Sequence, residues 1–162
     1  MGLVLLQACL AALRPQGTVV VEPPSGWAVV RNYRFLSSEF VAFSDGVSRI
    51  DIQVVPMDRR SARLPLDLVA EARAMNGARG MGVSNVAWRT DHIVIDGREA
   101  WAVTGRRTWM FARADFTLAV VALGRKACLL SLHVPPERGL SALPAWSELL
   151  DTIHFRMPAD AP

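Results

Sequence analysis

Residues 92–134, HIVIDGREAWAVTGRRTWMFARADFTLAVVALGRKACLLSLHV, decide the fold of this protein. Apolar runs rich in β-branched residues alternate here with turn signals, Asp96-Gly97 and Gly124-Arg125-Lys126. Connections this short join antiparallel neighbours, because parallel strands need a longer crossover. The stretch therefore predicts an antiparallel meander with strands over residues 92–95, 98–107, 108–114, 116–123 and 127–134.

The residues before the meander predict further strands and one helix. Short strands are expected over residues 18–22 and 27–30, separated by a Pro-Pro-Ser-Gly turn. Residues 40–43 and 48–55 flank the turn signal Ser44-Asp45-Gly46, and apolar and polar residues alternate in the second run, which predicts a hairpin with one buried face. Leu64–Asn76 has apolar residues at helical spacing and predicts an amphipathic helix.

The residues that flank the meander complete the domain. Gly77–Gly82 is typical of a flexible connector, and residues 83–88 predict another strand. After the meander, Ser141 is expected to cap a helix over residues 143–153, and His154-Phe155-Arg156 is expected to return briefly as a strand. The fold class is therefore α+β, with an antiparallel β-sheet of about six or seven strands flanked by two helices.

Length and composition support one folded domain. The chain has 162 residues, of which 51% are hydrophobic and 20% charged, with a net charge of +3. These values exclude a disordered chain, and the absence of a basic block argues against a nucleic-acid partner. The longest apolar stretches, residues 3–13 and 116–123, are shorter than the roughly 20 residues that span a bilayer. We divide the chain into an N-terminal segment (1–16), a single domain (17–157) and a tail (158–162).

The N-terminal segment carries a candidate lipid-attachment site. Leu6-Gln7-Ala8-Cys9 resembles a bacterial lipobox, in which the cysteine becomes the lipidated N-terminus after cleavage. No Lys or Arg precedes the apolar run, which is also shorter than a usual signal peptide core. A plain secretory signal and an apolar helix docked on the domain are the alternatives. In the first reading, the lipid on Cys9 is the protein's only attachment to the membrane.

Four features of the sequence resemble the PsbP-like and DcrB-like superfamily over about residues 18–155. They are Pro24-Ser25-Gly26-Trp27, the turn Asp96-Gly97-Arg98-Glu99-Ala100, the helix Trp146–Ile153 and its end at Ile153-His154-Phe155. The resemblance implies a twisted antiparallel sheet sandwiched between helices. It also implies binding rather than catalysis, supplies no catalytic residue, and points to the branch of bacterial envelope lipoproteins.

The residues that usually carry chemistry are dispersed in this chain. His92, His133 and His154 are far apart and lack the close spacing of metal-binding motifs, so we expect no metal and no other cofactor. There is no nucleophile elbow around a serine, and Cys128 lies in an apolar strand typical of the core. We therefore expect no catalytic residues and no enzymatic activity.

Two groups of residues are candidates for binding. Arginine pairs at Arg59-Arg60 and Arg106-Arg107, with Arg63 and Arg125-Lys126, would form an anion or headgroup site if the fold brought them together; otherwise they form a solvated rim. Trp101 and Trp109, with Phe111 on the same predicted strand face as Trp109, would form either an interface or part of the core.

These observations predict a non-enzymatic envelope protein, lipid-anchored on the periplasmic face, that binds an unidentified protein partner. Two alternatives stay open. One is a cytosolic chaperone or adaptor for secreted effectors with the same fold, and the other is a small-anion-binding domain that uses the arginine clusters.

Overall fold

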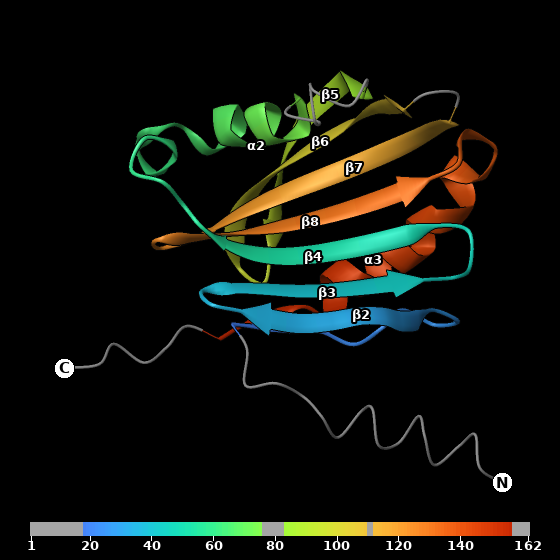
Figure 1. Cartoon of the computed structure of the whole chain (residues 1–162), viewed down its shortest axis with the longest axis horizontal. Coiled ribbons are helices and arrows are strands. Elements are labelled where there is room, and N and C mark those ends of the chain that lie inside the picture. Colours follow the sequence, from blue (N-terminus) through green and yellow to red (C-terminus); the bar gives the residue numbers. More distant parts are fainter. Residues whose placement is uncertain (1–17, 76–82, 110–111, 157–162) are drawn as a thin grey trace, which may run out of the picture.

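The computed structural model describes residues 18–75, 83–109 and 112–156 and contains one large antiparallel sheet (Figure 1). This sheet has seven strands in the order β2-β3-β4-β8-β7-β6-β5, and a two-stranded sheet joins β1 to β9. The strands are β1 (Val19–Val20), β2 (Ala28–Phe35), β3 (Ser38–Ser44), β4 (Arg49–Pro56), β5 (Val83–Ile95), β6 (Arg98–Trp109), β7 (Ala112–Leu123), β8 (Lys126–Val134) and β9 (His154–Phe155). The helices are α2 (Leu66–Met75) and α3 (Leu143–Thr152), with 3-10 turns η1 (Ser61–Arg63) and η3 (Pro136–Ala142).

The sheet consists of two meanders that meet at its centre. The first runs β2-β3-β4, and the chain then passes through α2 to the opposite edge and returns as β5-β6-β7-β8. The return places β8 against β4, with Ile52 opposite Leu130 and Val54 opposite Cys128. The predicted α+β class with about seven antiparallel strands is therefore confirmed.

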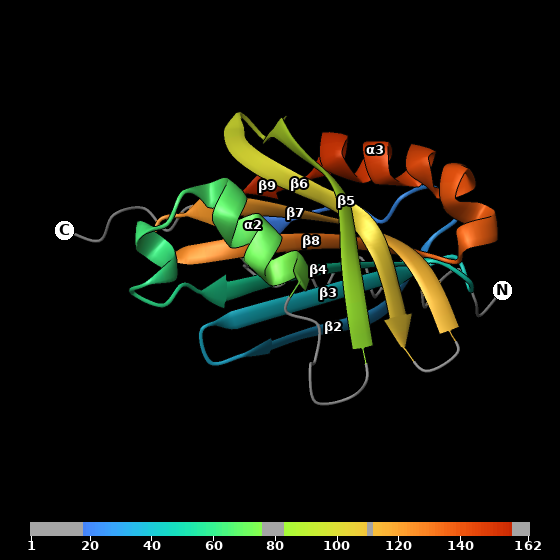
Figure 2. The ribbon, with the colours of Figure 1, turned by 90° about the horizontal axis from the view of Figure 1, so that it is seen from above.

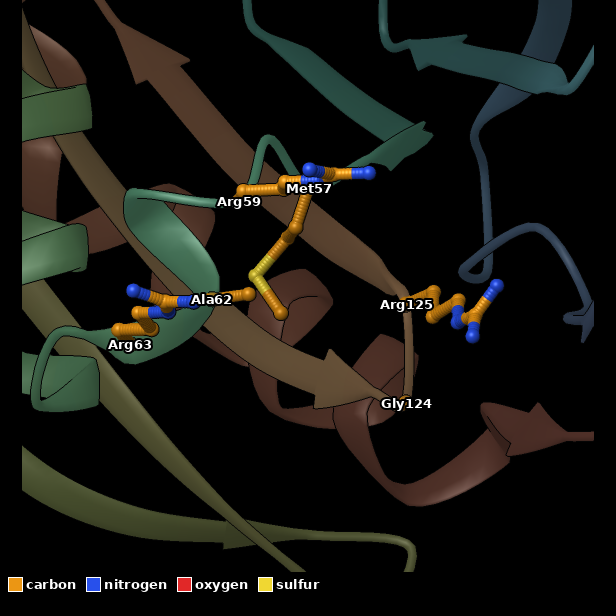
Figure 3. Close-up of a pocket in the computed structure, with 6 residues that line it drawn as sticks. All are labelled: Met57, Arg59, Ala62, Arg63, Gly124 and Arg125. Carbon is orange, nitrogen blue, oxygen red and sulfur yellow. The ribbon is translucent and has the colours of Figure 1, made fainter.

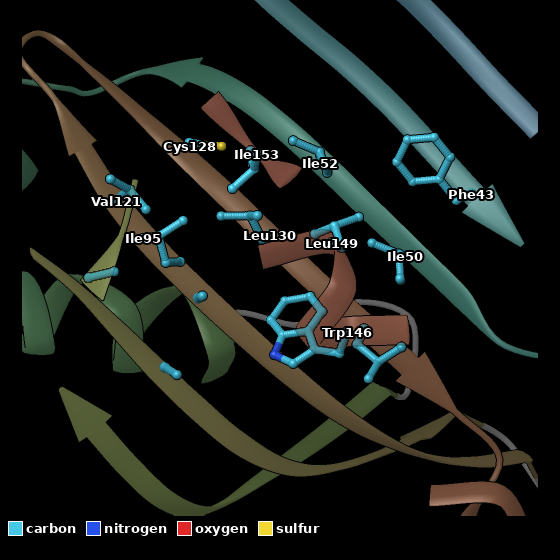
Figure 4. Close-up of a cluster of buried hydrophobic side chains, with 14 of the residues drawn as sticks. Phe43, Ile50, Ile52, Ile95, Val121, Cys128, Leu130, Trp146, Leu149 and Ile153 are labelled. Carbon is cyan, nitrogen blue, oxygen red and sulfur yellow. The ribbon is translucent and has the colours of Figure 1, made fainter. Parts of the chain in front are cut away.

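The two helices cover opposite faces of the sheet (Figure 2). On the face toward α3, which we call the α3 face, alternate residues of β4 and β8 such as Ile50, Ile52 and Leu130 pack around Trp146 and Leu149 (Figure 4). On the other face, the α2 face, Val69 and Ala70 of α2 pack against β6 and β7. The alternation predicted for residues 48–55 is confirmed, since Ile50, Ile52 and Val54 are buried and their neighbours are half-buried.

The predicted turn at Asp96-Gly97 also holds the two sheets together. Both residues have positive φ, 50° and 70°, as a two-residue hairpin turn of this type requires. The Asp96 carboxylate accepts hydrogen bonds from the backbone N–H of Phe155 at 2.7 Å and pairs with Nδ1 of His154 at 3.1 Å. The confirmed turn thus anchors β9, which was expected only as a brief return to strand.

Three predicted strand boundaries are wrong. Residues 83–95 form one strand rather than two, because a bulge between Ala87 and Arg89 shifts the register without ending the pairing. The predicted strands 108–114 and 116–123 are separated at Asp115, but no strand ends there, because the Asp115 carboxylate pairs with Arg106 on β6 and β7 runs from Ala112 to Leu123. β6 in turn continues to Trp109. β2 extends to Phe35, beyond the predicted end at Val30.

The other boundaries differ more modestly. The helix α2 starts at Leu66 rather than Leu64, and only Val19–Val20 of the predicted strand 18–22 pairs. Ser141 does not cap α3: it lies in η3, where its hydroxyl donates to the Arg138 carbonyl at 2.8 Å, and Ala142 occupies the cap position. The predicted connector 77–82 lies outside the described residues.

A substitution at Gly105 tests the close contact between β5 and β6. A Cβ at this position would overlap the backbone carbonyl of Val86, next to the bulge. We expect Gly105→Ala to lower the free energy of unfolding by about 2–3 kcal/mol, because backbone atoms must move to relieve the overlap. Urea unfolding measures this change, with Thr108→Ala on the same strand as a control that changes stability by less than about 1 kcal/mol. An unchanged midpoint for Gly105→Ala would contradict the packing.

Candidate functional site

Three of the arginines singled out in the sequence, Arg59, Arg63 and Arg125, line a pocket at the end of the sheet where β4 meets the β7–β8 turn (Figure 3). The pocket has a volume of about 430 Å³ and is lined by Met57, Arg59, Ala62, Arg63, Gly124 and Arg125. A backbone hydrogen bond from Met57 N to the Arg125 carbonyl, 2.9 Å long, joins the two segments. In Figure 3 the Met57 side chain points into the centre, while the guanidinium groups of Arg63 and Arg125 point away from each other. The pocket thus has an apolar floor and a charged rim, and Arg60 does not line it.

Arg106 and Arg107 lie far from this pocket and on opposite faces of the sheet. Arg106 pairs in register with Asp115, which is separated from Gly124 by roughly 30 Å along β7. On the α3 face, Nε of Arg106 donates to Asp115 at 2.9 Å and the guanidinium lies 4.9 Å from the Trp88 ring. Arg107, the next residue, lies on the α2 face, because neighbouring side chains of a strand alternate. The structure therefore divides the arginine pairs among three environments and does not assemble them into one site.

The structure describes only part of the aromatic group that the sequence offered either as an interface or as part of the core. Trp101 is half-buried and packs against the apolar cluster beneath α2, and its ring lies 5.3 Å from that of His92. Trp109 is the last residue of β6, so the predicted strand that carried both Trp109 and Phe111 is not present. The side chain of Trp109 and all of Phe111 lie outside the described residues. The position of Trp101 agrees with its interpretation as part of the core rather than as part of an interface.

Of the two cysteines, the structure describes Cys128. Cys9 lies outside the described residues, so its predicted lipidation stays a prediction. Cys128 is fully buried on the α3 face, where burial and the nearby charge of Glu39 raise the pKa of its thiol well above the usual range. The interpretation of Cys128 as a core residue is confirmed.

The edge strand β2 exposes a band of apolar side chains that the sequence analysis did not recognise. All eight residues of β2 are exposed, and among the strands of the described residues β2 pairs only with β3. Val30, Tyr33 and Phe35 are 51%, 55% and 68% exposed, and the adjoining Leu36 is 86% exposed. Arg31 and Arg34 interrupt the apolar pattern of residues 28–35, so the alternation of apolar and polar residues does not predict the full length of the strand. Such an edge offers unpaired backbone groups beside apolar side chains.

A second feature missed by the sequence analysis is a polar cluster on the α2 face, beyond the end of the helix. Arg49 and His133 are register partners on β4 and β8. Asp51 accepts a hydrogen bond from Nε of Arg49 at 2.6 Å, and its other oxygen lies 3.9 Å from Nε2 of His133. Burial lowers the pKa of His133 to about 4, helped by the charge of Arg107, while Asp51 opposes the shift. At neutral pH this imidazole is therefore uncharged.

The three histidines occupy three different places, with Trp101, Asp51 and Asp96 as their respective neighbours. Within residues 18–75, 83–109 and 112–156, no three His, Cys, Asp or Glu side chains gather in a way that could hold a metal ion. In the same ranges, none of the helices has the length and apolar character of a membrane span.

Comparisons with known proteins connect this architecture to solved structures. The sequence matches no protein-family model and no curated protein. The solution structure of cyanobacterial PsbP (CyanoP) from Synechocystis sp. PCC 6803 matches with a TM-score of 0.63 and 13% identity over 86% of this chain and 87% of that chain. The fold is PsbP-like. The crystal structure of LpqN, which is involved in cell envelope biogenesis of Mycobacterium tuberculosis, matches with a TM-score of 0.60 and 10% identity over 86% of this chain and 83% of that chain.

A third solved structure with a similar fold is a protein of unknown function. PA94, a protein of unknown function from Pseudomonas aeruginosa, has a TM-score of 0.55 and 12% identity over 80% of this chain and 98% of that chain. The resemblance inferred from the sequence is confirmed as a PsbP-like fold. At these identities the likeness establishes the fold alone, and the functional residues of this PsbP-like domain must be argued from its own surface.

The buried His133 predicts a specific pH dependence of stability. Its pKa is about 4 in the folded protein and about 6.5 in an unfolded chain, so between these values the unfolded state binds more protons. The free energy of unfolding therefore falls as the pH drops from about 6.5 to about 4, by up to about 3 kcal/mol from this residue.

His133→Gln isolates this contribution, because glutamine does not titrate. We expect urea unfolding to show that the wild type loses more stability than His133→Gln between pH 6.5 and pH 4. Carboxylates with lowered pKa values, such as Asp96 and Glu39, titrate in both proteins and cancel in the comparison. Parallel stability profiles for the two proteins would contradict the assignment.

Proposed function

We propose that this protein is a non-enzymatic accessory module of the bacterial cell envelope that binds a protein partner along strand β2. The observation that carries the proposal is the exposed apolar edge formed by Val30, Tyr33, Phe35 and Leu36. A PsbP-like domain in LpqN, a protein of envelope biogenesis, supports the assignment to the envelope.

The chemistry of β2 suits the addition of a strand from another protein. An edge strand has backbone N–H and C=O groups that can continue the sheet, and its side chains give specificity. Tyr33 stacks on Phe40 of β3 with ring centroids 5.1 Å apart, which holds one anchor in place on the α2 face. Val29 lies opposite Phe43 and so projects on the α3 face, where it is 44% exposed. A partner strand would therefore contact apolar groups on both faces, with the charge of Arg31 favouring an acidic residue opposite it.

Lipid attachment at Cys9 would keep this edge near membrane-associated partners. Acyl chains contribute about 0.8 kcal/mol for each buried methylene, so a diacylated cysteine holds a folded domain on the bilayer. The proposal needs no membrane-spanning helix.

Detergent partitioning and intact mass test the lipid anchor at Cys9. Expressed in a bacterial host with its native upstream sequence, the wild type is expected to partition into detergent and to have a mass that fits a diacylated Cys9 terminus. Cys9→Ala is expected to stay in the aqueous phase, and Cys128→Ala, which removes the buried thiol, is expected to partition like the wild type. A wild-type protein that is aqueous and retains Met1 would overturn the envelope assignment in favour of the cytosolic adaptor.

Lysine variants on the two edge strands test whether β2 binds the partner. Val30→Lys places a charge on this edge, and Val94→Lys places the same charge on the opposite edge strand, where Val94 is 64% exposed. We expect chemical cross-linking in the native host to give one discrete adduct for the wild type and for Val94→Lys, and at least about tenfold less for Val30→Lys. The substitution removes an apolar contact and adds a third cation to an edge that already carries Arg31 and Arg34. Thermal melts of all three proteins should agree. Equal adducts for the two lysine variants would exclude β2 as the binding edge.

A further inference from the structure

Two buried polar atoms on the α2 face have no partner among the residues that the structure describes. They are Nε of Arg107 and Oδ1 of Asn85. The two residues are register partners on β6 and β5, so their side chains lie next to each other on the same face. A buried donor or acceptor without a partner costs about 1–3 kcal/mol, and native structures leave very few. Both atoms are therefore free to bond to groups other than the described residues, such as a ligand.

The remaining polar contacts fix the orientation of Asn85. Its amide nitrogen donates to the carbonyl oxygen of Ala74 in the last turn of α2. This contact satisfies a carbonyl at the negative end of the helix and leaves the amide oxygen as the acceptor of the pair. Asn85 is 8% exposed, so its oxygen is screened from bulk water.

The charges around Arg107 leave its guanidinium uncompensated. Asp51, the carboxylate of the neighbouring cluster, is already bound to Arg49 through a 2.6 Å contact. In residues 18–75, 83–109 and 112–156, no carboxylate lies within ion-pair distance of Arg107. The charge of Arg107 is also felt at His133, whose pKa it helps to lower. The half-buried guanidinium of Arg107 therefore offers donors to an anion.

We infer that Arg107 and Asn85 form a binding site for an oxyanion that carries its own O–H group, with hydrogen phosphate as the simplest ligand. The guanidinium donates to an anionic oxygen, and the O–H donates to Oδ1 of Asn85. Sulfate and simple carboxylates have no O–H at neutral pH and would leave the Asn85 oxygen unpaired. This site is independent of the β2 edge, and it differs from the arginine site expected from the sequence because it uses Arg107 without Arg106, Arg59 or Arg60.

A phosphoryl oxygen beside an O–H occurs both in free hydrogen phosphate and in glycerol phosphate, the headgroup unit of anionic lipids. The test uses the full chain with inorganic phosphate, glycerol 1-phosphate and sulfate as separate probes, followed by NMR of the His133 ring. A bound anion adds negative charge near the imidazole, so the pKa of His133 is expected to rise from about 4 as phosphate is added. Tighter binding of glycerol 1-phosphate than of phosphate would identify the headgroup as the source, and the reverse would identify the free ion.

Arg106 and Arg107 are adjacent, so a variant of Arg106 is the matched control for a variant of Arg107. Arg107→Met is expected to weaken phosphate binding at least about tenfold, because it removes a charged hydrogen bond. Arg106→Met removes the same charge one residue away on the α3 face and is expected to change the affinity less than about twofold. Asn85→Ala is expected to reduce the preference for phosphate over sulfate, and thermal melts establish that each variant is folded.

Three results would overturn the inference. The first is an unchanged His133 signal at millimolar phosphate, which would leave the two buried atoms to ordered water. The second is equal binding of sulfate and phosphate by the wild type, which would remove the role of Asn85. The third is an equal loss for Arg106→Met and Arg107→Met, which would show a general effect of charge.

Discussion

The pairing of β4 with β8, which we call the seam, is the interaction on which the rest of this structure depends. It joins residues 70 to 84 positions apart and converts two separate meanders into one seven-stranded sheet. Residues at this seam, such as Ile52 and Leu130, are fully buried on the α3 face, where α3 covers them. Without the seam, each meander would leave an apolar edge unpaired, and α3 would lose Ile50 and Ile52 of β4 from the surface that it covers.

The seam also explains why the two faces differ. The helix α2 is the crossover between the meanders and packs on β5, β6 and β7. Beyond it, the α2 face at the centre of the sheet carries half-buried polar residues, including Asp51, which accepts a hydrogen bond from Arg49, and the neighbouring His133. The polar cluster and the site inferred at Arg107 and Asn85 therefore lie where the crossover helix ends. The β2 edge is a separate consequence of the same topology, because the strand order leaves β2 outermost.

The PsbP-like fold provides a stable frame for these two surfaces without prescribing what either binds. A strand-binding edge and an oxyanion site use different elements and different chemistry. An accessory protein of the envelope could therefore hold a protein partner on β2 while an anionic group occupies the α2 face, since the two proposals rest on separate groups of residues.

Local sequence determined the elements whose signals are local. The turns at Asp96-Gly97 and Gly124, the alternation of Ile50, Ile52 and Val54, and the helical spacing in residues 66–75 all predicted what the structure shows. The exposed strand β2, the continuity of β5 through its bulge and the pairing of Asp115 with Arg106 depended on the register between neighbouring strands, which the periodicity of a single strand does not reveal. The same is true of the binding surfaces: Arg106 and Arg107 are adjacent in sequence, yet strand alternation puts them on opposite faces, while the register of β5 and β6 brings Asn85 beside Arg107. Periodicity reports which side of an element is apolar, but only the tertiary pairing decides which polar groups meet.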